Sequence, residues 1–463
     1  MSADGCSDPS VVEWKGKLMM MTACDDGRRR VYESGDKGNS WTEALGTLSR
    51  VWVNNHKRHK KGVRSGFTTA KIDGFEDDKR NVMLVTLPVH SKAEKENEIE
   101  KDVLHLWLTD NTHIVDIGPV SGNNDDVAAS SLLYKSGNQG NKEEELISLY
   151  EKKGGGESSL GMVSVLLTEQ LKRVREVLAT WNKVDQSVSQ LCGSESAEED
   201  TSTDNACSAD KITAGLVGFL SGSFSDGTWR DEYLGVNAIV KSGIGADNGV
   251  TFTGRGAGAE WPVGEQGENQ LYHFANYNFT LVATVSIHGL PKDGDNSIPL
   301  MGAKVNDGDK NSVLLGLSYN REKRWELLHG GEKTSEHSRT WEPGTTYHVA
   351  IVLQNGNQGS VYVDGQRVCE SVHSNLENTD SKGISHFFIG GDGGNAENTG
   401  GNEGVSVTVT NVLLYNRPLT FAGGSADLEE VIASPSEASV EHLRGSGLLP
   451  LLLLLGLWGF AAL

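Results

Sequence analysis

Residues 34–41 read SGDKGNSW, and this stretch decides how the N-terminal part of the chain folds. Ser34, Asp36, Gly38 and Trp41 follow the spacing S-x-D-x-G-x-S-W. In a turn of this kind the Asp side chain accepts hydrogen bonds from backbone amides, Gly takes a positive φ, and Trp packs under the turn. The stretch therefore predicts a tight turn between two β-strands, with a structural and not a catalytic role.

Short apolar runs separated by turn residues extend from this turn. The first series is predicted to form strands at 17–22, 30–33, 82–88 and 104–109. A second series is predicted at 272–287, 313–319, 347–353, 359–363, 384–389 and 405–415. Asn355-Gly356 and Asp364-Gly365 are typical of hairpin turns. This spacing indicates a mostly β protein whose second part, 214–422, is a two-sheet sandwich.

One helix is predicted between these two regions, over 161–192. Its apolar residues recur at steps of three or four and are Leu167, Leu171, Val174, Leu178, Trp181, Val184, Val188 and Leu191. That spacing places them on one face of a helix. We expect the helix to pack against both β-rich regions as a rigid connector between the N-terminal part, 1–160, and a loop at 193–213.

The chain has 463 residues and a formal net charge of -21. An acidic chain repels nucleic-acid phosphates, which excludes nucleic acid as a general partner. The basic run at 57–61 is interpreted as a solvated loop. The cysteines lack the spacing of a zinc site, and 390–404 lacks the regular Asp spacing of a calcium loop. No cofactor or metal is expected.

The C-terminal residues 448–463, LLPLLLLLGLWGFAAL, form an apolar tail. The preceding segment, 423–447, is a polar spacer that contains a cluster of small residues from Ser434 to Ser439. This order is the signal for a glycosylphosphatidylinositol anchor, attached within that cluster and with Ser436 as the first choice of attachment residue. A tail-anchored transmembrane helix or a buried core helix is the alternative. The N-terminus has no signal peptide, so we expect that an N-terminal part of the protein is missing from this chain.

Five cysteines are present, and two of them, Cys192 and Cys207, bracket a polar loop. A disulfide that closes this loop suits an extracellular protein. Cys6, Cys24 and Cys369 remain, so at least one thiol is left without a partner. Asn278 begins the sequon Asn-Phe-Thr, which is used only if the chain is secreted.

Residues 407–417, VTVTNVLLYNR, resemble the VTVxNVxLYNR signature of trypanosomal trans-sialidases and their surface-glycoprotein relatives. The signature positions are Val407, Thr408, Val409, Asn411, Val412, Leu414, Tyr415, Asn416 and Arg417. Further matches are VYESGDKGNSW, GTLSRVW, LWLTDN, SSLLYK, AGLVGFLSG, WPVGEQGENQLYHFAN and ISHFFIGG. The resemblance implies an incomplete sialidase-type β-propeller, a long helix and a lectin-like sandwich of the concanavalin or laminin-G kind. It also implies that SGDKGNSW is an Asp-box, and that Cys192 and Cys207 are bridged.

Active members of this family hold the sialic-acid carboxylate with three arginines and attack the sugar with a tyrosine that a glutamate assists. Carried over, the assisting glutamate is Glu13. The second arginine is Arg28, with a one-residue slip to Arg29 as the alternative. The third arginine is replaced by Lys101, which keeps the charge but lacks the planar fork. The first arginine and the acid/base aspartate would belong to the missing part.

The resemblance places the nucleophilic tyrosine at Ala129, because the active pattern AYSS reads AASS here. Tyr134 belongs to the following strand and matches another tyrosine. The glutamate that orients an arginine matches Glu151, and the aromatic residue at the acceptor sugar is replaced by Ile99. Loss of the nucleophile alone is expected to remove most turnover.

The resemblance therefore predicts a non-catalytic adhesin for host-cell or matrix glycoconjugates, displayed at the cell surface through a lipid anchor. The VTV motif is implicated in the family in binding a host intermediate-filament protein. Val407 and Val409 are expected to serve mainly the sandwich core, so that only outward side chains could contact a partner. One alternative is an exo-α-sialidase or trans-sialidase. Another is a gene that serves as a reservoir of sequence diversity.

Overall fold

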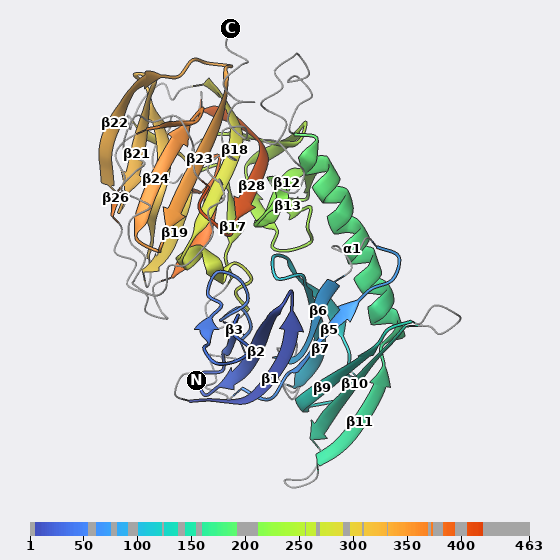
Figure 1. Ribbon diagram of the computed structural model, residues 1–463. Coiled ribbons are helices and arrows are strands. Elements are labelled where there is room, and N and C mark those ends of the chain that lie inside the picture. Colours follow the sequence, from blue (N-terminus) through green and yellow to red (C-terminus); the bar gives the residue numbers. More distant parts are fainter. Residues whose placement is uncertain are drawn as a thin grey trace, which may run out of the picture.

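The computed structural model describes most of the chain up to residue 419. The described residues are 5–53, 62–75, 81–90, 101–122, 125–137, 144–153, 160–191, 212–254, 256–264, 269–289, 297–307, 310–330, 332–368, 372–373, 383–393 and 405–419. Several predicted positions lie outside them, namely Ile99, Cys192, Cys207, Cys369 and the anchor window from Ser434 through Ser436 to Ser439. The protein is mostly β, as predicted, with three small sheets, one long helix and a C-terminal sandwich (Figure 1).

The N-terminal part consists of three antiparallel sheets, each built from strands consecutive in the chain. The first sheet contains β1 (Cys6–Trp14), β2 (Lys17–Cys24), β3 (Arg29–Ser34) and β4 (Thr42–Glu43). The second contains β5 (Gly66–Lys71), β6 (Asn81–His90), β7 (Asp102–Thr109) and β8 (Ile114–Pro119). The third contains β9 (Val127–Lys135), β10 (Glu145–Lys153) and β11 (Leu160–Leu166).

The three sheets stack face to face like blades of a propeller, with β1 beside β5 and β5 beside β9. Alternate residues of β6 serve the two sides of the second sheet. Met83 and Val85 pack into a core shared with the first sheet, whereas Val82 and Leu84 pack into a core shared with the third sheet and the helix. The second sheet is therefore covered on both faces by its neighbours.

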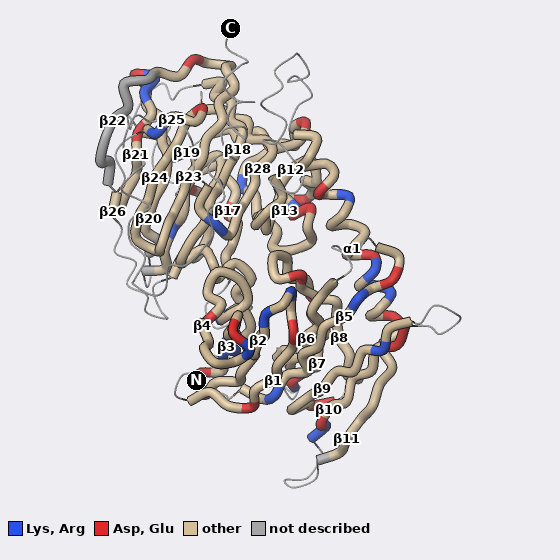
Figure 2. Tube along the Cα trace, viewed as in Figure 1, with Lys and Arg blue, Asp and Glu red and all other residues tan. Residues whose placement is uncertain are grey.

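Helix α1 (Thr168–Ser189) follows the third sheet. Its buried face carries the predicted residues from Leu171 to Val188 together with Val177, and Leu167 just before the helix is also buried. The prediction is wrong for Leu191, which lies beyond the helix and is 39% exposed. Figure 2 shows charged residues along the helix, and Lys172, Arg173 and Glu176 are exposed. The prediction that the helix begins at 161 is wrong. Residues 161–166 lie in β11, because their side chains alternate and their backbone pairs with the free edge of β10.

The sandwich is a closed antiparallel structure around one large apolar core. Its strands are β12 (Leu216–Ser225), β13 (Thr228–Asp231), β14 (Ala238–Lys241), β15 (Gly243–Ala246), β16 (Gly249–Thr253), β17 (Gly258–Pro262), β18 (Phe279–Gly289), β19 (Ser297–Asp307), β20 (Lys310–Asn320), β21 (Arg324–His329), β22 (Glu332–Thr340), β23 (Thr346–Gln354), β24 (Gln358–Val363), β25 (Gln366–Arg367), β26 (Val372–His373), β27 (Ile384–Ile389) and β28 (Ser406–Tyr415), with a short 3-10 helix, η3 (His273–Asn276). Both predicted hairpin turns are confirmed, because Asn355, Gly356, Asp364 and Gly365 all take positive φ. Among the described residues, no helix is both long and apolar enough to cross a membrane.

The helix joins the two β regions through one continuous apolar core. Leu171 and Val174 of α1 pack in it with Leu106 of the second sheet, and Val282 and Leu413 of the sandwich belong to the same cluster. The expectation that the helix contacts both β regions is therefore confirmed.

His113, in the loop after β7, lies at the centre of this junction. Its ring stacks on Tyr233 of the sandwich at 4.2 Å between centroids and lies 4.9 Å from the ring of Trp181. Trp181 donates from Nε1 to the carbonyl oxygen of Tyr233 at 2.9 Å, and the Tyr233 hydroxyl donates to Asp185 at 2.8 Å. One imidazole therefore touches both the helix and the sandwich from the side of the second sheet.

The charges at this junction favour a protonated imidazole. Burial lowers the pKa of His113, but the adjacent Asp110 carboxylate, 3.0 Å from Nδ1, and the charges of Asp185 and Asp231 outweigh burial and raise it above its usual value. Burial also raises the pKa of Asp231 to about 6, against the backbone hydrogen bonds that it accepts. A group whose pKa is higher in the folded state contributes stability at low pH and loses it as pH rises through the folded value.

We predict that His113→Gln lowers the free energy of unfolding by about 2 kcal/mol at pH 5, because a hydrogen bond to a charged partner is lost. The difference from the unmodified protein should be fully present below about pH 6.5, the pKa of a free imidazole, and should shrink as pH rises through the higher pKa of the folded state. Chemical denaturation at pH 5 and at a series of higher pH values measures both. A difference that stays constant, or grows with pH, would contradict the assignment of a charged His113.

Candidate functional site

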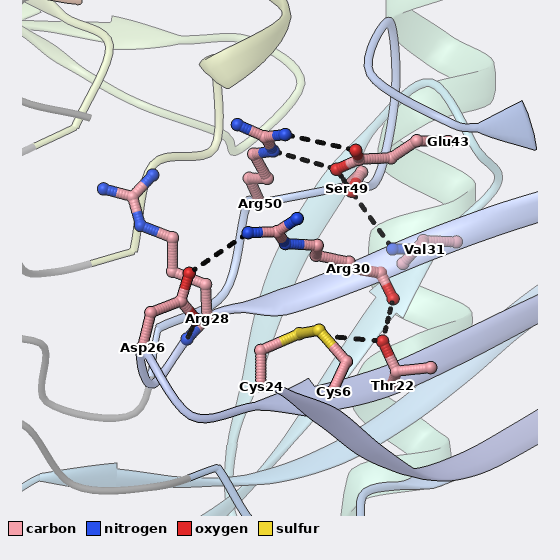
Figure 3. Close-up of polar contacts among 10 residues, drawn as sticks. All are labelled: Cys6, Thr22, Cys24, Asp26, Arg28, Arg30, Val31, Glu43, Ser49 and Arg50. Atoms are coloured by element: carbon pink, nitrogen blue, oxygen red, sulfur yellow. Dashed lines mark hydrogen bonds and ion pairs between the residues drawn. A yellow bond between two sulfur atoms is a disulfide. The ribbon is translucent and has the colours of Figure 1, made fainter. Parts of the chain in front are cut away.

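A tight turn between β2 and β3 leads into three consecutive arginines, of which Figure 3 shows Arg28 and Arg30. The amide of Arg28 donates to Asp26 Oδ1 at 2.9 Å, and the amide of Gly27 donates to the carbonyl of Cys24 at 3.0 Å. Gly27 has a φ of +80°, which a residue with a Cβ rarely adopts. The Asp-Asp-Gly sequence therefore closes the turn and starts β3 at the arginines.

The three arginines have different environments. Arg29 is fully buried between the first and second sheets, where Nε donates to Ser65 Oγ at 2.6 Å and Nη2 donates to the carbonyl of Val63 at 3.1 Å. Burial lowers the pKa of Arg29 to about 10. Arg28 is 3% exposed, and its side chain extends away from Arg30, which pairs with Asp26 at 3.5 Å (Figure 3). Arg29 therefore connects two sheets.

Arg50 adds a fourth arginine beside this turn. It makes a two-pronged ion pair with Glu43, at 2.8 and 3.1 Å, and Ser49 Oγ donates to the same carboxylate at 2.7 Å. Burial raises the pKa of Glu43, but the bonds from Arg50 and Ser49 outweigh burial and lower it. Four arginines against three carboxylates, Asp25, Asp26 and Glu43, leave this region slightly cationic within an acidic chain.

A disulfide joins Cys6 of β1 to Cys24 of β2, next to the arginine turn. The sequence analysis left both cysteines unassigned. The hairpin turn at Lys15-Gly16 pairs Ser10 with Met21, a register that would place Cys6 opposite residue 25. A bulge between Ser7 and Ser10 shifts the pairing by one, so that Cys6 meets Cys24. The positions of the two cysteines on either side of the predicted hairpin could have indicated the bridge. The bulge, which the sequence does not show, changes the register by one residue.

Glu13 does not lie near Arg28. It sits opposite Leu18 at the turn end of the β1–β2 hairpin, whereas Arg28 follows Cys24 at the other end. Seven residues of β1 separate Glu13 from Cys6, which is roughly 20 Å at the rise of a strand. The Glu13 side chain is exposed, on the opposite face from buried Val12 and Trp14. The structure therefore does not bring these two family positions together.

Ala129 and Glu151 do lie together in the third sheet. Ser130 pairs with Tyr150 and Val127 with Lys152, so a bulge places Ala129 beside Glu151. Both side chains are partly exposed.

Lys101 precedes β7 near the same end of these sheets. The amide of its neighbour Asp102 donates to Asp126 at 3.2 Å, just before β9 begins. Lys153 lies 3.6 Å from Asp102 and 2.9 Å from Asp126, which ties β7, β9 and β10 together. Three of the family positions, Lys101, Ala129 and Glu151, therefore share one end of the second and third sheets.

Buried hydroxyl groups connect the arginine turn to Ala129. Ser65, which binds Arg29, accepts a bond at its carbonyl from Ser10 Oγ at 2.9 Å. The amide of the next residue, Gly66, donates to Ser130 Oγ at 3.2 Å. A Cβ on Gly66 would lie 2.4 Å from Thr86 Oγ1. The inner strands therefore approach closely and hold the backbone around Ala129 in place.

The described tyrosines of the three sheets all have other roles. Tyr150 donates to Asp125 at 2.7 Å, and burial and this carboxylate raise its pKa to about 12. Tyr134 donates to the carbonyl of Lys71 at 2.6 Å, and burial together with Glu144 raises its pKa. Tyr32 is buried. In the described part of these sheets, the hydroxyl groups of Tyr134 and Tyr150 are therefore engaged in hydrogen bonds away from Ala129.

The Asp-box residues form the turn between β3 and β4. Asp36 Oδ1 accepts from the Ser40 amide at 2.9 Å, and Ser34 Oγ accepts from the Gly38 amide at 2.8 Å. Hydrogen bonds from Ser40 and Ser34 lower the pKa of Asp36 to about 2. Trp41 Nε1 donates to the carbonyl of Gly38 at 3.1 Å. Each signature side chain therefore closes the turn, with no group left over for chemistry.

The VTV motif forms β28 in the middle of the sandwich. Val407 and Val409 are 1% exposed and lie in the core, as expected. Outside the core, Thr408 Oγ1 lies 2.8 Å from Thr251 Oγ1 and 2.9 Å from His288 Nε2.

The end of the same motif contacts other parts of the chain. Tyr415 donates to the carbonyl of Ile212 at 3.1 Å, and Arg417 Nε donates to that of Ala214 at 2.7 Å. Asn416 reaches the carbonyl of Gly46, in the turn after β4, at 3.4 Å. Val412 and Leu414 are buried, and Asn411 has a φ of +48° at a bulge. Most of the motif therefore holds the sandwich and its surroundings together.

Two further observations concern the glycosylation sequon and metal binding. Asn278 is partly exposed, and its Oδ1 accepts from the Asn355 amide at 2.9 Å. Across the described ranges, no group of three or more His, Cys, Asp or Glu residues is placed to hold a metal ion.

Comparison with known proteins identifies the family of this architecture. The family described as "Trans-sialidase, C-terminal domain" matches residues 212–422, "BNR repeat-like domain" matches 1–151, and "Trans-sialidase of Trypanosoma hydrophobic C-terminal" matches 443–463. Sialidase 85-1.3 of Trypanosoma cruzi is 34% identical over 40% of this chain and 100% of its own length. The chain belongs to the trans-sialidase superfamily.

The longer relatives extend beyond this chain. A sialidase of Trypanosoma cruzi is 35% identical over 89% of this chain but only 33% of its own length. Trypanosoma rangeli sialidase in a covalent complex with 2,3-difluorosialic acid is similar with a TM-score of 0.76 and 39% identity, over 90% of this chain and 61% of that one. The three sheets of this trans-sialidase relative therefore correspond to part of a sialidase propeller.

We predict that replacing both Cys6 and Cys24 by serine lowers the free energy of unfolding by about 3 kcal/mol, because the bridge restricts the unfolded chain over a separation of 18 residues. Urea denaturation measures this loss. A reducing agent should weaken the unmodified protein by more than it weakens the double variant, which has lost this bridge already. Equal stability of the two proteins under oxidising conditions would show that the bridge is absent or without effect.

Proposed function

We propose that this chain is a trans-sialidase-like surface glycoprotein that binds glycoconjugates and does not cleave sialic acid. Ala129 carries the proposal. It stands where the family resemblance places the nucleophile, and a methyl group cannot attack the anomeric carbon. The adjacent Ser130 hydroxyl is buried and engaged with Thr86 and Gly66, so it offers no substitute.

The surroundings of Ala129 support the same conclusion. Lys101 keeps a positive charge but cannot form the two parallel bonds by which arginine holds a carboxylate. Glu13 lies at the far end of its hairpin from Arg28, so a nucleophile beside Arg28 would lack this glutamate. Three differences from active family members, at Ala129, Lys101 and Glu13, would have to be reversed before the chain could cleave sialic acid. The loss of catalytic groups of this kind lowers the rate by orders of magnitude.

A binding role is assigned to the sandwich, where alternate residues of the first half of the central strand β28 are partly exposed. The core-facing valines of the VTV motif are occupied by packing, so binding falls to its outward residues, above all Thr408 and Thr410. Threonine hydroxyls donate and accept hydrogen bonds, as do sugar hydroxyls. Host-cell or matrix glycoconjugates are the partners that we propose.

The same proposal covers location. The match of 443–463 to the hydrophobic C-terminus of Trypanosoma trans-sialidases supports removal of this tail and lipid attachment between Ser434 and Ser439, with Ser436 as the first choice. Asn278, with its side chain partly exposed, is the proposed glycosylation site of a secreted chain. The protein would then be displayed at the cell surface.

The alternative is an exo-α-sialidase or trans-sialidase, which the names of the relatives favour. We predict that the chain releases no sialic acid from sialyllactose and transfers none to lactose, under conditions in which an active family member does both. Ala129→Tyr should bind the same ligands as the unmodified chain, because its fold is kept. Turnover by the unmodified chain would overturn the proposal and establish the sialidase.

We also predict that the full chain binds glycans on an array or on matrix glycoproteins, and that Thr408→Ala weakens this binding several-fold. Thr42→Ala is the matched control, because Thr42 is an exposed threonine on the first sheet. Thermal unfolding checks that both variants keep the fold. Unchanged binding by Thr408→Ala would remove β28 from the proposed site, and no binding at all would contradict the adhesin function.

A further inference from the structure

A cluster of polar side chains lies on the outward face of one sheet of the sandwich, around β27. Strand β27 pairs with β17 and β19, whereas β28 pairs with β12, β16 and β18, so the two strands lie in opposite sheets. Phe387 of β27 and Val409 of β28 belong to the core between these sheets. His386 and Phe388 alternate with Phe387 along β27 and therefore point away from this core. The cluster thus lies on the opposite side of the sandwich from Thr408.

Phe388 forms the floor of the cluster. It pairs with Glu260 of β17 on one side and with Gly302 of β19 on the other. A Cβ on Gly302 would lie 2.5 Å from the Phe388 ring, and a Cβ on Gly316 would lie 3.0 Å from it. The ring therefore fills the space next to two glycines, and Lys304 Nζ lies 5.7 Å from its centroid.

His386 is buried beside this floor with one ring nitrogen unpartnered. Ser385 Oγ donates to the carbonyl oxygen of Lys304 at 3.1 Å, and the same Oγ lies 3.0 Å from His386 Nδ1. A hydroxyl group has one proton, so both contacts are hydrogen bonds only if Nδ1 carries the imidazole proton and donates it to Oγ. Nε2 then presents a bare lone pair, and no group in the described part of the chain donates to it. A buried acceptor of this kind needs a donor from a ligand or from water.

Lys304 lies directly opposite His386 in the sheet. Its ammonium group donates to the carbonyl oxygen of Asp392 at 2.7 Å and lies 3.7 Å from the Asp392 carboxylate, and its side chain is only 11% exposed. The turn before Asp392 is packed tightly, because a Cβ on Gly391 would lie 2.1 Å from the carbonyl oxygen of Ala257. An ammonium group has three protons, so Lys304 can donate a further hydrogen bond beside His386.

The exposed end of the cluster consists of an ion pair and an isoleucine. Lys241 of β14 lies 3.0 Å from Glu260, and the two side chains are 53% and 35% exposed. Ile239 pairs with Glu260 across β14 and β17 and is also exposed. Exposure falls from this ion pair to Lys304 and then to His386, which is 8% exposed. The cluster therefore extends from the surface to the buried acceptor Nε2.

The charges of the cluster are balanced. Lys241 and Lys304 each have a carboxylate nearby, from Glu260 and Asp392 respectively. Burial lowers the pKa of His386, and Lys304 and Lys241 also lower it, whereas Glu260 raises it. The imidazole is therefore neutral at pH 7. Among the described residues these groups are also not placed to hold a metal ion. The cluster therefore suits a neutral ligand and not an ion.

We propose that this cluster binds a neutral sugar. One sugar hydroxyl donates to His386 Nε2, and a neighbouring hydroxyl accepts from Lys304 and donates to Glu260. Vicinal hydroxyls suit this arrangement because each can both donate and accept a hydrogen bond, and the C–H face of the sugar ring can contact Ile239. The site extends the proposed glycan-binding function to the opposite side of the sandwich from β28. It uses no residue of that strand, so that either site can fail alone.

Nitrogen NMR of the full chain, with isotope-labelled histidine rings, tests the proposal with methyl α-mannoside and methyl β-galactoside as neutral sugar probes. The His386 signals are assigned by their absence from His386→Phe. We expect the Nε2 signal of His386 to be that of an unprotonated nitrogen and to move when at least one of the two sugars binds. Lys304→Met should weaken this binding at least about tenfold, because it removes a charged donor but keeps the length of the side chain.

Lys323→Met is the matched control, because Lys323 is another ion-paired lysine of the sandwich, 2.6 Å from Glu342. It should leave the sugar affinity unchanged. Thr408→Ala acts on the other proposed site and should not alter the movement of the His386 signal. Thermal unfolding checks that each variant keeps the fold.

The other outcomes overturn the proposal. An Nε2 signal that neither sugar moves would show that only water binds there. A signal that moves with N-acetylneuraminic acid but with neither neutral sugar would show that the ligand is charged. Sugar binding that Thr408→Ala abolishes and Lys304→Met leaves intact would assign all binding to β28.

Discussion

The apolar core around helix α1 is the constraint on which the arrangement of the molecule depends. The inner face of the third sheet packs on the second sheet, and Leu171 and Val174 of the helix belong to the same core. The other end of the helix packs on the sandwich through Trp181 and Tyr233. His113 inserts between them from the side of the second sheet, so that three parts of the chain contribute to one packed cluster.

The same close packing surrounds Ala129. The inner strands are held by Ser65, Gly66, Thr86 and Ser130, and a Cβ on Gly66 would lie 2.4 Å from Thr86 Oγ1. The backbone around Ala129 is therefore fixed by the buried contacts of its neighbours, and in the proposed function Ala129 itself contributes no reactive group.

Much of the fold could be predicted from the sequence, because it depends on local patterns. The Asp-box turn, both Gly-containing hairpins and the buried stripe of α1 follow from spacing alone. The start of the helix could not, because 161–166 is apolar enough for either structure and only the free edge of β10 selects a strand. The Cys6–Cys24 bridge was missed because one bulge residue changes the register. The separation of Glu13 from Arg28 likewise needs the hairpin register.

Strands β9 and β10 carry apolar residues on both sides, the pattern of strands that are covered twice, and Leu133 and Leu149 on one of these sides are exposed. The sandwich instead closes on itself through β12 and β28 and buries its own core. Its Val282 and Leu413 also belong to the core around the helix. The sandwich therefore has one core of its own and a second that it shares with the helix and the sheets, so that its position is tied to theirs.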